Sequence, residues 1–317
     1  MSRVVSGGLP DRYKQAKPEE THEVQPFLRV NKDGIDLGKQ EVTHEVLPYL
    51  KVYKDGTIER LAGPDVVPAA FDPQTGVLSK DIEIMLDAKV SARLYRPNLI
   101  NDQTNNQKLP LVVYFHGGAF LICSTGEPLK APEHPFPTAY NDSWDVLQWV
   151  ASHAYGAGRD SAGANTAHHR AIRHQCSNHA IRLKLAGIVL IHPYFWGVEP
   201  IGSEVTDLVR KSMVDKWWQF VCPSNRGNDD LLINPFANGA PSLESLECDR
   251  VLVCVAEKDT LRDRGRLYYD SLVKSNWKGA AEIIKSEEED HVFHIFNPNC
   301  EKALSMIKSL ATFINLK

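Results

Sequence analysis

The sequence predicts an α/β fold with a mostly parallel central sheet. Residues 79–86 (SKDIEIML) and 90–95 (VSARLY) alternate between polar and apolar side chains, as a pair of half-buried antiparallel strands would. After them, continuous apolar runs alternate with segments of helical spacing. A continuous apolar run is typical of a strand that is buried on both faces of a parallel sheet. This order of elements predicts an α/β domain.

The later strands and helices follow from the same patterns. Buried strands are expected at residues 111–115 (LVVYF), 185–192 (LAGIVLIH) and 250–256 (RVLVCVA), with a last strand at 281–285. Helices are expected at residues 137–152, 162–174, 208–220, 264–273 and 300–314. Residues 1–20 are polar, and we expect them to be disordered.

An internal repeat lies near the N-terminus. Residues 21–34 (THEVQPFLRVNKDG) and 43–56 (THEVLPYLKVYKDG) are identical at ten of fourteen positions. Each copy is expected to form a short apolar segment that ends in a turn at Lys-Asp-Gly. Two copies are too few for a solenoid. We interpret one copy as redundant, with a purpose-built extension as the alternative, and predict an N-terminal extension over residues 1–40, partly disordered, and a domain over residues 41–317.

Composition excludes several classes of partner. The chain has 317 residues, with 43% hydrophobic and 24% charged residues, which is ordinary usage for a globular protein with a sizeable core. A net charge of -4 without a basic stripe argues against nucleic acid and membrane surfaces. The N-terminus lacks the apolar stretch of a secretory signal, and the 6 cysteines form no C-x-x-C pair. We therefore expect a cytoplasmic protein with reduced thiols.

Two segments can supply the chemistry of acyl transfer. His116, Gly117 and Gly118 follow the expected strand LVVYF, and paired glycines there leave backbone N–H groups free to stabilise an oxyanion. The alternative is a simple turn. Ser161 opens an expected helix in the sequence DSAGAN, where a tight turn can expose its Oγ and Ala162 can add a further N–H donor. On its own, S-x-G is a weak signal, because small residues begin many helices.

A carboxylate and a histidine complete the set. Asp259 follows the C-terminal end of the run RVLVCVA, where ligand sites of parallel sheets lie, although a surface carboxylate would look the same. His291 lies in the loop before the last helix, where it can act as a general base on Ser161 while Asp259 orients the imidazole. The order Ser161, Asp259, His291 is the chain order of α/β-hydrolases and differs from those of chymotrypsin and subtilisin.

Other candidate sites favour simpler interpretations. Four histidines lie on or beside one helix without the carboxylate or cysteine partners of a metal site, so we expect no metal there: His168, His169, His174 and His179. The adjacent Trp217 and Trp218 are expected to serve core or cap packing, with a cofactor site as the alternative. No phosphate-binding or dinucleotide-binding glycine motif is present in the sequence.

The chain resembles the plant carboxylesterase family, the HGG-motif branch of the α/β-hydrolases that is related to hormone-sensitive lipase. The resemblance extends from about residue 41 to the C-terminus, in the segments YFHGGAF, APEHPFPTAYNDSWDVLQWVASH, DSAGANTAHH, GIVLIHPYFWGVEPIGSE, VLVCVAEKDTLRDRG and EDHVFHIFNP. It implies an α/β-hydrolase fold and a cytosolic enzyme that hydrolyses small acyl esters without a metal or cofactor. It also implies Ser161 as nucleophile, Asp259 as acid and His291 as base, with an oxyanion hole formed by His116, Gly117, Gly118 and Ala162.

Relatives of different function leave alternatives open. The gibberellin receptors resemble this family but lack the catalytic histidine, which this chain keeps at His291. A non-catalytic binder of small molecules is therefore one alternative. Dehydratases and cyclases of plant specialised metabolism resemble the family as well, and a lyase or cyclase activity is the other alternative.

The sequence departs from the family pattern around Ser161. The motif G-x-S-x-G has Arg159 in place of its first glycine, and no apolar run precedes Ser161. Roughly 40 residues between Phe120 and Ser161 are too few for two parallel strands with their crossovers. We therefore expect a sheet that lacks two central strands, a strained elbow at Arg159, weak esterase activity and low stability. Either a normal esterase sequence was duplicated near its start and shortened twice in its middle, or this is a pseudo-enzyme with a rebuilt centre.

Overall fold

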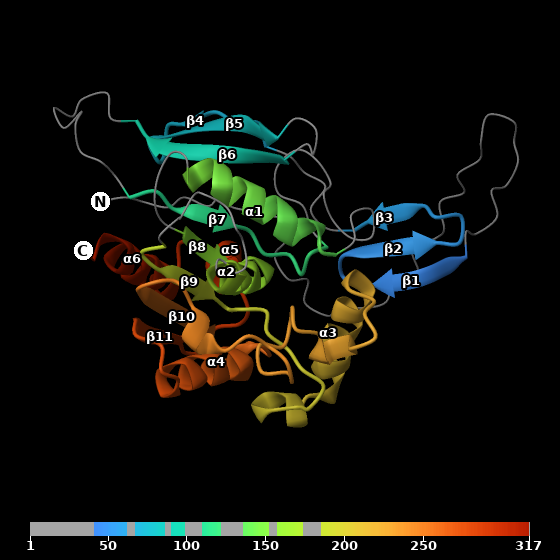
Figure 1. Ribbon diagram of the computed structural model, residues 1–317. Helices are drawn as coiled ribbons and strands as arrows, with labels where there is room; N and C mark the ends of the chain where they lie inside the picture. The colour runs from blue at the N-terminus through green and yellow to red at the C-terminus, as the bar shows by residue number, and fades with distance from the viewer. Residues whose placement is uncertain are drawn as a thin grey trace, which may run out of the picture.

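The computed structural model describes residues 41–61, 67–85, 90–98, 110–121, 136–151, 157–173 and 185–316. The proposed extension over residues 1–40, with its expected disorder and the first copy of the repeat, lies outside these residues. Figure 1 shows a central sheet with helices packed around it and two smaller groups of strands beside it.

A five-stranded parallel sheet forms the centre, in the order β11-β10-β9-β8-β7 (Figure 1). Its strands are β7 (Val113–Phe115), β8 (Ala157–Asp160), β9 (Ile188–Ile191), β10 (Arg250–Ala256) and β11 (Ala280–Ser286). Every neighbouring pair is parallel, as predicted. Because successive side chains of a strand point to opposite faces, β10 contributes Val253 to the core on one face and Leu252 to the core on the other.

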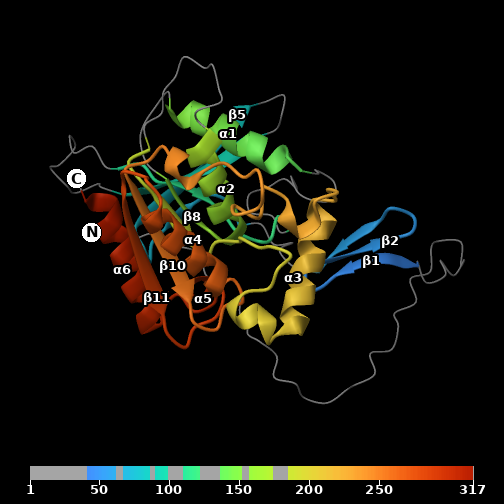
Figure 2. The same ribbon diagram turned by 60° about the horizontal axis from the view of Figure 1, so that its bottom comes forward.

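Helices cover both faces of this sheet (Figure 2). The core on one face includes side chains of α1 (Thr138–Ala151), α2 (Ser161–Arg173) and α4 (Arg262–Lys274). The other face packs against α6 (Glu301–Asn315), which follows the short α5 (Phe293–Phe296). These positions agree with the predicted helices to within a few residues. In the part of the chain that the structure describes, no helix is both long and apolar enough to cross a membrane.

A separate antiparallel sheet contains β4 (Phe71–Asp72), β5 (Val77–Met85) and β6 (Val90–Pro97). The predicted antiparallel pairing of the two alternating segments is confirmed by β5 and β6. Helix α1 lies beside this sheet in Figure 1 and contacts both β5 and β6. Within the described residues, β6 pairs only with β5 and β7 only with β8, so each is an edge strand and the two sheets are not joined.

The expectation that no strand precedes Ser161 is wrong. Strand β8 (Ala157–Asp160) ends directly before it and pairs with β7 and β9. Its sequence, AGRD, has no apolar pattern, but strand pairing uses backbone N–H and C=O groups, which every residue but proline carries in full. Among the described residues between Phe120 and Ser161 there is no second strand. In the described part of the chain, no strand connects β6 to β7.

The predicted strand LVVYF is shorter and less buried than expected. Strand β7 contains three of its residues, and of these only Val113 is fully buried, whereas the Tyr114 side chain is 52% exposed. On β6, an edge strand of the antiparallel sheet, Tyr95 is 62% exposed. The apolar run predicts a strand with a neighbour on each side, but among the strands that the structure describes β7 pairs only with β8.

The second copy of the repeat forms most of a third sheet, composed of β1 (Val42–Val46), β2 (Leu50–Tyr53) and β3 (Ile58–Arg60). The predicted turn at Lys-Asp-Gly is confirmed, with Gly56 at a φ of +83°. The copy is a hairpin of two strands, however, and not the single apolar segment that we expected. Val46 and Leu50 are its buried residues.

This hairpin packs against α3 (Leu208–Val221), as both views show (Figures 1 and 2). The Trp217 indole N–H donates to the carbonyl of Leu47 at 3.0 Å, and its ring lies 5.1 Å from that of Tyr49. Trp218 is fully buried. The prediction that the tryptophan pair serves packing is confirmed.

Candidate active site

Three neighbouring parallel strands end at one edge of the central sheet. Asp160, the last residue of β8, pairs with Ile191 at the end of β9, and Ile191 pairs with Cys254 of β10. The residues that follow these strands therefore lie side by side. Ser161 follows β8, and Asp259 comes three residues after β10.

The structure brings Ser161, His291 and Asp259 together. His291 lies between β11 and α5, with its Nε2 3.0 Å from Ser161 Oγ and its Nδ1 2.8 Å from Asp259 Oδ2. An ionised carboxylate can only accept hydrogen bonds, so Nδ1 donates to Asp259 and Nε2 is left to accept from the serine hydroxyl. The three side chains form one continuous hydrogen-bonded chain.

Asp259 is a buried carboxylate and not the surface group that the sequence left open as an alternative. Its exposed fraction is 2%, and its Oδ1 accepts the N–H of Leu261 at 2.9 Å. Burial is the largest single influence and raises the pKa of this carboxyl, but the charge and hydrogen bond of His291, together with His192 and the N–H of Leu261, outweigh burial and hold the pKa of Asp259 below its ordinary value. The side chain is therefore ionised at neutral pH and fixes the orientation of the imidazole.

The turn at Ser161 has the strained geometry of a nucleophile elbow. Ser161 has a φ of +44°, in the left-handed region that side chains other than glycine rarely adopt. Its carbonyl accepts the N–H of Tyr194 at 3.1 Å. We expected Arg159 to distort this elbow, but the backbone of Arg159 lies within β8 and pairs with Phe115 and Leu190. The turn is made at the serine itself. The effect of the Arg159 side chain on the elbow stays a prediction, because that side chain lies outside the described part of the structure.

The HGG segment begins beside this elbow. Phe115 at the end of β7 pairs with Arg159, so Gly117 and Gly118 follow β7 at the same sheet edge as Ser161. Gly118 has a φ of +106°, which suits a residue without a Cβ. Ala162, directly after the serine, is buried. The His116 side chain is exposed, and its Nδ1 lies 2.7 Å from the carbonyl oxygen of Gly117.

Sequence reasoning missed His192, which follows β9 between the strands of Ser161 and Asp259. In the sequence it is only the last residue of the apolar run LAGIVLIH and part of the family-like segment GIVLIHPYFWG. The ring is buried, and its Nδ1 accepts the N–H of Val292 at 2.8 Å. Burial lowers the pKa of His192 to about 3, and it lowers the pKa of the nearby His294 to about 4. Both imidazoles are therefore neutral at physiological pH.

One group among the described residues has the spacing of a cation site. Ligand atoms of His192, Asp259 and His291 all lie within 4.8 Å of one another. A cation there would compete for the atoms that join Asp259 to His291. The histidines of α2 have other partners: His168 Nδ1 lies 2.9 Å from the hydroxyl of Tyr268, and His169 Nε2 donates to the carbonyl of Leu232. His174 and His179 lie outside the described residues.

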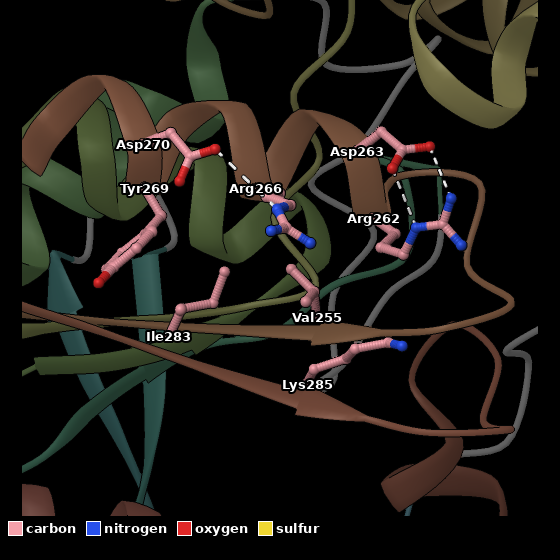
Figure 3. Close-up of a pocket in the computed structure, with 8 residues that line it drawn as sticks. All are labelled: Val255, Arg262, Asp263, Arg266, Tyr269, Asp270, Ile283 and Lys285. Carbon is pink, nitrogen blue, oxygen red and sulfur yellow. Dashed lines mark hydrogen bonds and ion pairs between the residues drawn. The ribbon is translucent and has the colours of Figure 1, made fainter. Parts of the chain in front are cut away.

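A pocket of about 330 Å³ lies away from these residues, between α4 and the strands β10 and β11 (Figure 3). Four of its charged side chains form two pairs, Arg262 with Asp263 and Arg266 with Asp270, and Lys285 pairs with Glu257 outside the lining. None of the residues described above lines it. Its lining is Val255, Arg262, Asp263, Arg266, Tyr269, Asp270, Ile283 and Lys285.

A serine, a carboxylate and a histidine at the strand ends of a parallel sheet, in this chain order, define the α/β-hydrolase class. Residues 129–295 match the family model for the alpha/beta hydrolase fold. The chain is 50% identical to probable carboxylesterase 2 of Arabidopsis thaliana, with 95% of this chain and 98% of that protein aligned. The chain belongs to the plant carboxylesterase family of α/β-hydrolases. It is also 39% identical to a 2-hydroxyisoflavanone dehydratase of Glycyrrhiza echinata, over 93% of this chain and 96% of that protein.

Solved structures agree with the fold. A hyperthermophilic esterase from Pyrobaculum calidifontis superposes with a TM-score of 0.61 at 25% identity, covering 74% of this chain and 84% of that one. The thermostable carboxylesterase EstE1, from a metagenomic library, superposes with a TM-score of 0.62 at 24% identity, covering 78% of this chain and 90% of that one. The alignment with the Arabidopsis relative has 337 positions, more than the 317 residues of this chain, of which only 95% are aligned. The relative therefore has residues at positions where this chain has none, in keeping with the expected internal shortening.

Proposed function

We propose that this protein hydrolyses carboxylic esters of small acyl groups through Ser161, His291 and Asp259. The observation that carries the proposal is the continuous hydrogen-bonded chain from Ser161 Oγ through His291 to Asp259, with distances of 3.0 and 2.8 Å. Both distances lie within hydrogen-bond reach, which is the geometry that a serine nucleophile and its general base require.

In the first half of the reaction, Ser161 Oγ attacks the ester carbonyl while His291 Nε2 takes the hydroxyl proton. Asp259 stabilises the imidazolium that forms and keeps Nδ1 as the donor nitrogen. The tetrahedral intermediate places negative charge on the former carbonyl oxygen. We assign its stabilisation to backbone N–H groups of the HGG segment, at Gly117 and Gly118, and of Ala162.

In the second half, the imidazolium returns its proton to the leaving alcohol, and an acyl group remains on Ser161. Water then attacks this acyl-enzyme, again with His291 as the base, and the carboxylic acid leaves. No other group is required to balance the protons, because His291 gains and loses one proton in each half.

The separation of the two sheets bears on stability more than on this chemistry. We infer that the chain keeps an assembled catalytic set and loses stability at the open edges of β6 and β7. The expectation of weak activity has two grounds, the Arg159 departure in the elbow motif and the absence of strands around Ser161, and for the second of these β8 is present directly before the serine. Activity is therefore expected as long as the protein stays folded.

A second candidate function is the elimination of water from a hydroxylated plant metabolite. It is favoured by the identity of 39% and 38% to 2-hydroxyisoflavanone dehydratases from Glycyrrhiza echinata and Glycine max. In an elimination, His291 would take a carbon-bound proton and Ser161 would form no covalent bond. A dehydratase would survive Ser161→Ala better than an esterase, which loses its nucleophile.

The test is hydrolysis of p-nitrophenyl acetate by the purified protein and by Ser161→Ala. An esterase loses nearly all of its kcat in the variant, by at least about 10⁴-fold. Equal hydrolysis by both proteins would refute the role of Ser161. A parallel incubation with a 2-hydroxyisoflavanone, followed by chromatography, decides between ester hydrolysis and dehydration.

A further inference from the structure

His192 connects the three parts of the site without touching the serine hydroxyl. Its backbone N–H donates to the carbonyl of Cys254 in β10 at 2.8 Å. Two residues later, the N–H of Tyr194 donates to the carbonyl of Ser161 at 3.1 Å. The segment that begins at His192 is thus bound both to the strand before Asp259 and to the elbow.

The His192 ring reaches the third part, the loop that carries His291. Its Nδ1 accepts the N–H of Val292 at 2.8 Å. An N–H group can only donate, so Nδ1 is the unprotonated nitrogen of this imidazole. The ring is enclosed by aromatic neighbours, with centroids 5.7 Å from His291, 5.8 Å from Phe293 and 5.6 Å from His294.

Both partners of this hydrogen bond have strained backbones. Val292 and His192 each have a φ of +46°. The left-handed region is rare for any residue with a Cβ, and a β-branched residue there is an outlier. Such conformations persist only where the surroundings hold them, and they cluster at functional sites. Of the two strained residues, Val292 is the one directly after His291.

We propose that His192 is a positioning residue, which holds the backbone at Val292 and thereby keeps His291 in line between Ser161 and Asp259. This inference rests on the proposed function, since it assigns His291 the role of base. The rival explanation is that the ring only fills space in the core.

Two substitutions separate these explanations, because each explanation predicts a different one of the two variants to be the more active. His192→Asn keeps an acceptor oxygen close to the position of Nδ1 and suits a positive φ, but it loses the ring. His192→Leu fills much of the space of the ring but has no acceptor. If the acceptor matters, kcat for p-nitrophenyl acetate falls on the order of 100-fold in the leucine variant and less than about 10-fold in the asparagine variant.

KM is expected to change little in either variant, because His192 does not contact the reacting atoms. The proposal is overturned if His192→Leu is as active as the original protein, or if it is more active than His192→Asn. A double-mutant cycle adds a second test. Val292→Gly removes the strain, so His192→Leu is expected to cost much less kcat in that background.

A readout that does not depend on activity is the exchange rate of the Val292 amide hydrogen. It is expected to rise in His192→Leu and to stay slow in His192→Asn. Failure of the proposed function is recognised separately, because the original protein would then show no Ser161-dependent hydrolysis. The exchange rate of the Val292 amide would still report whether His192 holds the backbone there. Equal exchange in all three proteins would contradict the proposal.

Discussion

A Cβ on Gly163 would lie 1.9 Å from the carbonyl oxygen of Phe115. The first turn of α2 therefore touches the backbone at the end of β7 directly, and it can do so only because residue 163 has no side chain. This contact sets the distance between the elbow at Ser161 and the HGG segment that follows Phe115.

Gly163→Ala is expected to lower both stability and activity. The added methyl group meets a backbone carbonyl, which cannot rotate away, so we expect a loss of at least about 3 kcal/mol in the free energy of unfolding. Urea denaturation measures it. Gly187→Ala is the control, because its nearest contacts would be the carbonyl of Arg250 and the ring of Phe313, both at 3.1 Å, which a shift of a few tenths of an ångström relieves. An alanine variant at residue 163 as stable as the control would contradict this contact.

Stability is expected to fall as the pH is lowered from about 6.5 to 5. The pKa values of His192 and His294 in the folded protein are about 3 and about 4, below the ordinary value of 6.5. At a pH between the folded-state pKa values and 6.5, the histidines of the unfolded chain bind protons and those of the folded protein do not, so acid favours unfolding. Each residue contributes about 2 kcal/mol over this interval.

His294→Phe tests this pH dependence, because it keeps an aromatic ring and removes the proton-binding group. The decrease in Tm between pH 7 and pH 5 should be smaller in the variant than in the original protein. If Tm decreases by the same amount in both proteins between pH 7 and pH 5, burial of His294 is not a source of acid sensitivity.

The repeat offers a matched pair of substitutions. Leu50 is fully buried in the hairpin that packs on α3, so Leu50→Asp is expected to cost at least about 3 kcal/mol, because it buries a charge without a partner. The equivalent residue of the first copy is Leu28. If that copy is redundant, Leu28→Asp changes the free energy of unfolding by less than about 0.5 kcal/mol. A large loss in Leu28→Asp would favour a purpose-built extension instead.

The open edges of β6 and β7 predict a low Tm. Several apolar side chains there remain partly exposed, among them Leu94, Tyr95 and Val112. Since full burial of one large apolar side chain is worth about 2 kcal/mol, we expect a Tm about 10 °C below that of the Arabidopsis relative. Calorimetry of the two proteins under one set of conditions makes the comparison. Equal Tm values for the two proteins would mean that the open edges of β6 and β7 do not lower stability.

Periodicity predicted the elements whose side chains follow a simple pattern. Strand β10 was predicted at Arg250–Ala256, where the structure has it, because its residues form one apolar run between two layers of helices. Strand β8 could not be predicted in this way. Its residues, AGRD, form a strand through backbone pairing with residues far away in the chain. Arg159 pairs with Phe115, 44 residues before it, and with Leu190, 31 residues after it.

The site was predicted in part for a similar reason. Ser161, Asp259 and His291 are recognisable because their order along the chain is characteristic. His192 carries no such signal, since its role depends on the conformation of Val292 and on a hydrogen bond across 100 residues of sequence. The left-handed backbone of Val292 follows from the packing of the loop and is not visible in its residue type.

The most direct test of the account is covalent labelling with an organophosphate, followed by peptide mass spectrometry. A working chain from Asp259 through His291 to Ser161 predicts rapid phosphorylation at Ser161, and slow labelling in His291→Gln. An absence of adduct on Ser161 in the folded protein, or equal labelling in the His291 variant, would contradict it.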